Sequence, residues 1–172
     1  VVIADAKRGD IGNTGLHYAN AFFNHFNCDA ITVSPYMGEE SIEPFISNAS
    51  KGAYVLCRTS NISSTFIQKD IFSKVISLCD ALNKQQNIGL VVGATNDDVL
   101  MKVRNSTDLP FLIPGIGAQG GDLQSVLKIN EKNMDTTLIN VSRGIIFSGN
   151  KDHDSIRNSA KQYLNQIRGL NG

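Results

Sequence analysis

The densest run of chemically capable side chains is DAKRGDIGNT at residues 5–14, directly after the apolar residues 1–4. Side chains alternate along a strand, so Asp5 and Lys7 are expected on the same face. A carboxylate beside an ammonium can orient it for proton transfer or for stabilising developing negative charge. The same pair is also common as a structural ion pair, and both interpretations stay open on these residues alone.

The turn after this pair carries two further polar candidates, Asp10 and Thr14. Glycines on both sides of Asp10 allow a tight turn, which can bring its carboxylate toward the Asp5–Lys7 pair or toward a neighbouring subunit. In the purely structural alternative, Asp10 or Thr14 caps the helix expected near His17.

A glycine-rich segment, PGIGAQGGD at residues 114–122, forms the second cluster. Its GxGxxG spacing resembles a dinucleotide fingerprint, but that fingerprint belongs after the first strand of a Rossmann unit, with further βαβ structure downstream. Here only one strand and one helix are expected to follow. The segment is therefore interpreted as an anion-binding loop that presents backbone N–H groups and the Gln119 amide.

Two more polar clusters also follow predicted strands. In NVSRG (140–144), Arg143 can donate two parallel hydrogen bonds to a phosphate, although a strand-end Arg is as often a plain surface charge. In TSN (59–61), Ser60 is a weaker candidate because polar residues after strands are usually turn formers.

The elements that must position these side chains follow from periodicity. Short β-branched runs predict six buried strands, at residues 1–4, 30–33, 53–57, 88–92, 110–113 and 137–141. Apolar spacings of three and four predict helices over 67–82 and 156–167.

Alternation of strand and helix indicates a parallel α/β fold in one domain, residues 1–172. A doubly wound sheet and a (β/α)8 TIM barrel are the two candidates, and a chain that opens inside a strand without Met favours the barrel, with two βα units expected upstream.

Composition narrows the function classes. Sixteen basic residues balance sixteen acidic ones, so a nucleic-acid partner is not expected. No apolar run approaches the roughly 20 residues that span a bilayer, so no membrane partner is expected either. Three separated cysteines without a CxxC pair suit reduced thiols and a cytoplasmic protein. The three histidines lack metal-ligand spacing, so no metal site is predicted.

Together the motifs resemble those of orotidine 5'-monophosphate decarboxylases. DAKRGDIGNT is similar to that family's D-x-K-x-x-D-I-G-x-T signature, in the version with Arg-Gly between Lys and Asp, and PGIGAQGGD is similar to its substrate-covering loop. The TSN segment departs from the family pattern, because Ile62-Ser63 stands where Pro-Gly is usual. The resemblance implies a TIM barrel that converts orotidine 5'-monophosphate to uridine 5'-monophosphate, the last step of pyrimidine nucleotide synthesis, without a metal or organic cofactor.

The resemblance also implies residue roles. Lys7, Asp5 and Asp10 would be catalytic, Gln119 and Arg143 would hold the phosphate, and Ser60 would contact the pyrimidine. A homodimer is implied, with Asp10 and Thr14 reaching into the partner's site. The family's first catalytic Lys would lie upstream of this chain, and a fused orotate phosphoribosyltransferase domain is known among relatives. The alternatives are a Mg²⁺-dependent sugar-phosphate enzyme of the same barrel group, such as a hexulose-phosphate synthase, and a catalytically silent phosphate-binding subunit.

Overall fold

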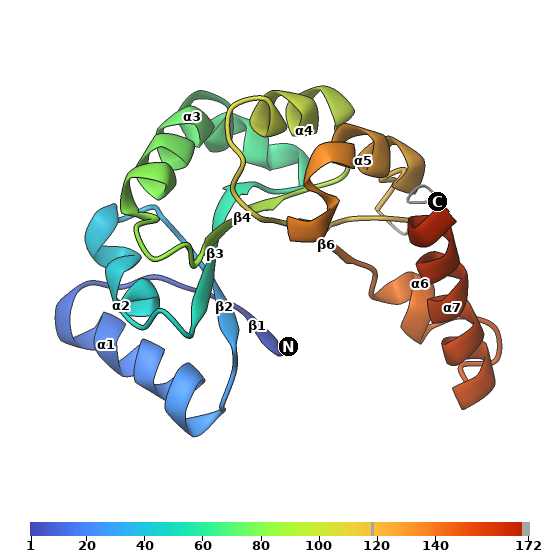
Figure 1. The fold of residues 1–172 in the computed structure, drawn as a ribbon, viewed down its shortest axis with the longest axis horizontal. Coiled ribbons are helices and arrows are strands. Elements are labelled where there is room, and N and C mark those ends of the chain that lie inside the picture. The colour runs from blue at the N-terminus through green and yellow to red at the C-terminus, as the bar shows by residue number, and fades with distance from the viewer. Residues whose placement is uncertain (118, 170–172) are drawn as a thin grey trace.

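The computed structural model describes residues 1–117 and 119–169, and these form one curved, six-stranded parallel sheet. The strands are β1 (Ile3–Arg8), β2 (Ala30–Val33), β3 (Gly52–Arg58), β4 (Ile88–Val92), β5 (Phe111–Pro114) and β6 (Thr137–Asn140). Every neighbouring pair is parallel, and the order in the sheet is the order in the chain. Figure 1 shows the sheet bent into an arch, with β1 and β6 at its two ends.

The helices cover the outer, convex side of this arch (Figure 1). The α-helices are α1 (Gly12–Asn20), α2 (Glu43–Ile46), α3 (Thr65–Leu82), α4 (Asp97–Arg104), α5 (Leu123–Ile129), α6 (Arg143–Ile146) and α7 (His153–Gly169). Shorter turns are the π-helical η1 (Ala21–His25) and the 3-10 helices η2 (Glu39–Ser41), η3 (Ile62–Ser64) and η4 (Glu131–Thr136). A doubly wound sheet reverses its strand order and carries helices on both faces. The sequential order and one-sided helices are instead those of part of a (β/α)8 barrel.

The core lies between the sheet and the helices. Strand residues such as Ile31, Val55 and Leu90 are fully buried there, and α3 packs Val75 and Cys79 against them. Every residue of β2 and β4 is buried, which is typical of the inner strands of a parallel sheet. This explains why continuous β-branched runs predicted these two strands with their observed bounds.

The first strand differs from its prediction, which placed it at residues 1–4. It spans Ile3–Arg8, so the chemical cluster begins inside the strand rather than after it. Its pairing is irregular, because Ala4 lies opposite Ile31 whereas Arg8 lies opposite Val33, so β1 advances by more residues than β2. Such a bulge locally redirects side chains. Lys7, within it, has φ of 49°, in the left-handed region that residues with a Cβ rarely adopt.

Among the described residues, no helix combines the length and the apolar character needed to cross a lipid bilayer.

Candidate active site

The centre of the candidate site is an ion pair on β1. Lys7 Nζ donates to Asp5 Oδ1 at 2.5 Å, and both side chains are at least half exposed. Partial burial raises the pKa of Asp5, but the hydrogen bonds from Lys7 and Thr32, together with the Lys7 charge, outweigh it. The pKa of Asp5 therefore lies below its ordinary value, which keeps the carboxylate charged beside the ammonium. The predicted juxtaposition of Asp5 and Lys7 is present.

A buried hydroxyl on the next strand supports this pair. Thr32 Oγ1 accepts a hydrogen bond from the Lys7 backbone N–H at 2.9 Å and donates to Asp5 Oδ1 at 3.0 Å. Thr32 is 1% exposed, so these bonds lie beneath the ion pair rather than at its surface. Sequence reasoning missed this residue. Alternation of side chains along AITV could have placed Thr32 on the opposite face from the core residues Ile31 and Val33, but not beside Lys7.

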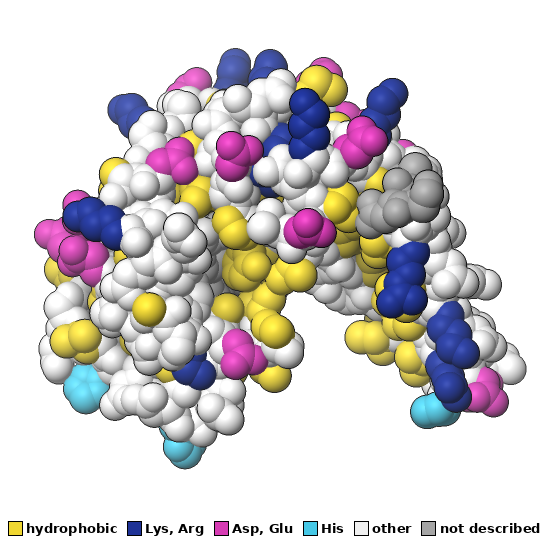
Figure 2. Space-filling model, viewed as in Figure 1, with side chains coloured by type: hydrophobic (Ala, Val, Ile, Leu, Met, Phe, Trp, Pro, Cys, Tyr) yellow, Lys and Arg dark blue, Asp and Glu magenta, His cyan; other side chains and the backbone are white. Residues whose placement is uncertain are grey.

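The ion pair faces a cavity of about 890 Å³ on the concave side of the sheet. Figure 2 shows hydrophobic side chains gathered in the hollow of the arch. Its apolar wall includes Ile3, Leu56, Val91, Leu112 and Leu138, from five different strands. Its polar lining includes Asp5, Lys7, Thr59, Ser60, Asn61, Gln119, Asn140 and Ser142. An apolar wall with a few convergent polar groups at the carboxyl ends of strands is the usual form of a small-molecule site in this type of fold.

Two of the predicted substrate-binding residues meet at the rim of this cavity. The Ser60 hydroxyl, after β3, donates to Gln119 Oε1 at 2.7 Å, across 59 positions of sequence. Ser60 is held by its neighbour Thr59, whose backbone N–H donates to Gln68 Oε1 on α3 at 2.8 Å. The TSN segment is therefore ordered by α3 without the Pro-Gly that the family pattern has after it.

The glycine-rich loop after β5 is a closed turn. The Gly121 N–H donates to the Gly115 carbonyl at 3.0 Å, and the Gly120 N–H donates to that of Gly117 at 2.8 Å. Gly115, Gly117 and Gly120 all have positive φ, so the fingerprint glycines serve backbone geometry. Gln119 of this loop lines the cavity, and Ala118 lies outside the described residues. The N–H groups of Gly117, Gly120 and Gly121 donate to carbonyls within the loop, so they are not presented to an anion as predicted. Anion binding by the loop stays a prediction.

The remaining predicted residues lie outside the cavity lining. Arg143 is exposed at the first position of α6, next to Ser142, which does line the cavity. Thr14 is exposed on α1, and Asp10 precedes that helix, with its Oδ1 accepting from the Ile11 N–H at 2.9 Å. The helix-capping alternative for Asp10 and Thr14 was wrong, because the N-cap position of α1 is Ile11 and Thr14 lies inside the helix.

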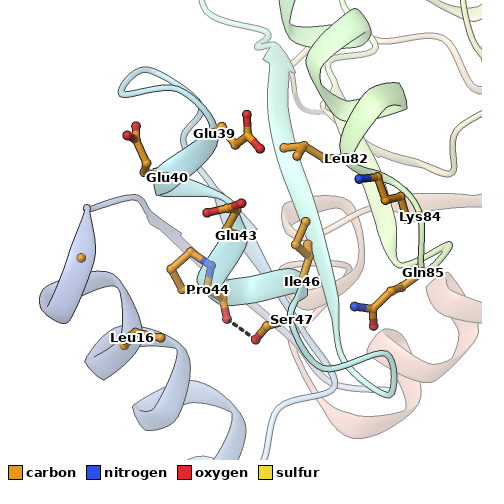
Figure 3. A pocket seen from close by; sticks show the side chains of 11 residues that line it. Leu16, Glu39, Glu40, Glu43, Pro44, Ile46, Ser47, Leu82, Lys84 and Gln85 are labelled. Atoms are coloured by element: carbon orange, nitrogen blue, oxygen red, sulfur yellow. Dashed lines mark hydrogen bonds between the residues drawn. The ribbon is translucent and has the colours of Figure 1, made fainter.

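A second hollow, of about 600 Å³, lies on the outer side of the sheet. It is lined by residues of α1, of the short helices η2 and α2, and of the end of α3 with the turn after it. Figure 3 shows Glu39, Glu40 and Glu43 around it, opposite Leu82 and Lys84. None of the predicted catalytic or substrate-binding residues lines this hollow. The described residues contain no group of three or more His, Cys, Asp or Glu side chains arranged to hold a metal ion.

Strand order, one-sided helices and a polar cavity at the carboxyl ends of the strands define a protein of the α/β-barrel class with a small-molecule site. Comparison with known proteins narrows this class. Residues 1–155 match the family described as Orotidine 5'-phosphate decarboxylase / HUMPS family. The chain belongs to that family.

Individual relatives agree with this assignment. The chain is 44% identical over 181 residues to an orotidine 5'-phosphate decarboxylase of Dehalococcoides mccartyi, covering 97% of this chain and 67% of the relative. It is 46% identical to one from Natronomonas pharaonis, covering 86% and 58%. The chain thus spans about two thirds or less of the length of these relatives. The chain is therefore a homologue of enzymes named as decarboxylases, which are carboxy-lyases of pyrimidine biosynthesis.

Solved structures show the same likeness in three dimensions. An OMP decarboxylase of Leishmania donovani has a TM-score of 0.89 at 38% identity, covering 98% of this chain and 68% of that one. The structure of a UMP synthase from the same organism has a TM-score of 0.90 at 40% identity, covering 98% of this chain and 39% of that one. The arch of six strands is therefore part of a TIM barrel.

Proposed function

We propose that the protein carrying this chain removes carbon dioxide from C6 of orotidine 5'-monophosphate to give uridine 5'-monophosphate. The observation that carries the proposal is the Lys7–Asp5 ion pair, which faces the cavity whose rim holds the linked Ser60 and Gln119. Breaking the bond to the carboxylate leaves an electron pair on C6, and catalysis requires positive charge placed where that negative charge develops.

In this proposal Lys7 is the central catalytic residue. Its ammonium stabilises the developing carbanion at C6 and then donates the proton that replaces carbon dioxide. Asp5 stays ionised beside it, holds the ammonium in place and lies near the departing carboxylate. The hydrogen bonds and charge that lower the pKa of Asp5 support this role.

The phosphate of the substrate lies, in this proposal, at the opposite side of the cavity from the reacting carbon. Gln119 and Arg143 bind it, and Ser60 contacts the pyrimidine ring. The hydrogen bond between Ser60 and Gln119 supports a coupling between base recognition and the phosphate loop. Binding energy from the distant phosphate then helps to organise the loop for reaction.

The test is the loss of orotidine 5'-monophosphate absorbance, with EDTA present, in the protein at its natural length. Turnover that EDTA leaves unchanged supports the decarboxylase. If the protein instead turns over a sugar phosphate, and EDTA abolishes that activity, the result would support the hexulose-phosphate synthase alternative. The matched family description includes both groups of enzymes. Nucleotide binding with no turnover of either substrate would support a silent phosphate-binding subunit.

The proposal includes a homodimer in which Asp10 and Thr14 serve the partner's site. Support comes from exposed apolar side chains in the segments that follow β1, β2 and β3, as far as the first turn of α3. The carboxyl ends of these strands share one edge of the sheet. They include Ile11, Tyr36, Met37, Ile62 and Phe66, of which Ile62 is 97% and Phe66 is 89% exposed. Apolar residues grouped on one rim indicate an interface, and Asp10 and Thr14 lie beside it.

Mixing two inactive variants tests the shared site. In a mixed dimer of Lys7→Ala and Asp10→Ala chains, one of the two sites keeps both residues if Asp10 acts across the interface. Random mixing should then restore about a quarter of wild-type activity. Recovery that stays at the level of the separate variants would show that each site is built from one chain.

We also propose that the protein is cytoplasmic. Free thiols at all three cysteines support this location, because a reducing compartment keeps thiols unpaired.

A further inference from the structure

We infer that Thr32 is a positioning residue of the active site. Its hydroxyl holds the Asp5 carboxylate and, through the Lys7 backbone N–H, fixes the conformation that directs the Lys7 ammonium into the cavity. The inference rests on the proposed decarboxylation. It goes beyond it because Thr32 belongs to none of the motifs that indicated the function.

The first support is the geometry of the hydroxyl. One oxygen accepts from the Lys7 backbone at 2.9 Å and donates to Asp5 at 3.0 Å, so a single group fixes both members of the ion pair. Asp5 Oδ1 accepts from Lys7 Nζ as well as from the hydroxyl. Thr32 thereby sets the position of the oxygen that Lys7 contacts.

The second support is the backbone at Lys7. A φ of 49° is uncommon for a residue with a Cβ and costs free energy, so contacts that favour it are needed. The bulge between Ala4 and Arg8 removes regular ladder pairing at this point, and the Lys7 N–H finds the Thr32 hydroxyl instead. This side-chain contact satisfies a strand N–H in a conformation that the strand itself does not favour.

The third support is burial. At 1% exposure, Thr32 is not among the residues that line the cavity, although its partners Asp5 and Lys7 are. It therefore acts through them rather than on the substrate. A hydroxyl that is buried, doubly engaged and adjacent to the reacting groups is suited to hold them in place.

The experiment compares Thr32→Val, Thr32→Ser and the control Thr137→Val in the protein at its natural length. Thr32→Val keeps the shape of the side chain but loses the hydroxyl. We expect its kcat to fall roughly 10- to 100-fold, as for a lost hydrogen bond to a charged group, with KM nearly unchanged because the phosphate contacts are remote. Thr32→Ser keeps the hydroxyl and should recover most of the rate.

The Thr137→Val control separates an effect on the active site from a general loss of protein stability. Thr137 is also buried and also donates a hydrogen bond, to the Asn133 carbonyl at 2.8 Å, but it begins β6 at the opposite edge of the sheet. Thr137→Val should lose stability as Thr32→Val does, yet keep kcat. Hydrogen exchange of the Lys7 amide should accelerate in Thr32→Val alone. If Thr32→Val fails to fold, Thr32→Ala against Thr32→Ser gives the same contrast.

The outcomes separate this inference from the proposed function. Suppose that the wild-type protein turns over orotidine 5'-monophosphate and that Thr32→Val is folded and equally fast. This result would overturn the role of Thr32 but not the proposed decarboxylation. A fall in kcat that Thr32→Ser does not recover would also overturn it, because the hydroxyl would not be the cause. A wild-type protein without turnover would instead overturn the proposed decarboxylation, and this inference with it.

Discussion

The Ser60 hydroxyl donates to the Gln119 side-chain oxygen at 2.7 Å and so joins the end of β3 to the glycine-rich loop after β5. If this bond couples base recognition to the phosphate loop, Ser60→Ala and Gln119→Ala should not act independently. A double-mutant cycle on kcat/KM should give a coupling energy of about 0.5–1.5 kcal/mol, the net value of one hydrogen bond. Additive effects of the two substitutions would mean that the contact has no part in turnover.

Lys7→Ala should abolish decarboxylation and leave binding of uridine 5'-monophosphate measurable by calorimetry, because the phosphate contacts remain. Lys7→Gly separates backbone strain from chemistry. It lacks the amine too, but glycine adopts the φ of 49° without a Cβ clash, so it should be about 1 kcal/mol more stable than Lys7→Ala. Substantial turnover in either variant would remove Lys7 from its central role.

Arg143→Ala should weaken substrate binding by roughly 2–4 kcal/mol, the range for a lost charge-assisted contact. The exposed Arg157 on α7 offers a matched control, since Arg157→Ala makes the same charge change away from the cavity. We expect KM to rise for Arg143→Ala and to stay constant for Arg157→Ala. Equal KM values in the two variants would place the phosphate elsewhere.

Two buried arginines differ in their partners, and their substitutions should differ accordingly. Arg104 Nε donates to Asn130 Oδ1 at 3.0 Å, its Nη1 donates to the Leu109 carbonyl at 3.2 Å, and its guanidinium stacks on Phe111, although its Nη2 is buried without a partner. Arg58 Nε and Nη1 are both buried without a hydrogen-bond partner. Arg104→Met should cost about 2–4 kcal/mol of unfolding free energy, and Arg58→Met should be neutral or stabilising by about 1 kcal/mol. Urea denaturation measures both, and a larger loss for Arg58→Met would contradict this reasoning.

Burial raises the pKa of the Cys57 and Cys79 thiols to about 12. At pH 8 both should resist iodoacetamide until the protein unfolds, which mass spectrometry with and without urea can follow. A thiol whose pKa is higher in the folded state binds more protons there, so stability is fully present below the unfolded pKa of about 8.5 and decreases as pH rises above it. Rapid alkylation of either thiol in the folded protein would show that burial does not protect it.

Local patterns predicted most of the fold. The apolar runs at 30–33 and 88–92 have the bounds of β2 and β4, and the stripe over 67–82 predicted nearly all of α3. β1 was misplaced because the apolar run ends at Ala4, whereas the strand continues through a bulge to Arg8. In that stretch Lys7 and Asp5 hydrogen-bond Thr32, which lies 25 and 27 positions further along the chain. No window around residues 1–8 contains that information.

The site was predictable to the extent that each strand end carries its own motif. Asp5, Lys7, Ser60 and Gln119 meet at one cavity because parallel strands bring their carboxyl ends to the same edge. The roles of Asp10, Thr14 and Arg143 remain predictions. All three lie outside the cavity lining of this chain, so their tests need a partner or a bound phosphate.

The agreement between strand order and chain order has a consequence for how the protein is made. Each strand from β2 onward pairs with the strand that left the ribosome just before it, so no strand has to insert between two that are already joined. The sheet can therefore grow at one edge during synthesis, one βα unit at a time, with each new unit covering apolar surface left by the last. The active site is assembled in two stages. Asp5, Lys7 and Thr32 meet once β1 and β2 have paired, whereas Gln119 reaches Ser60 only after β3, β4 and β5 have been laid down in turn.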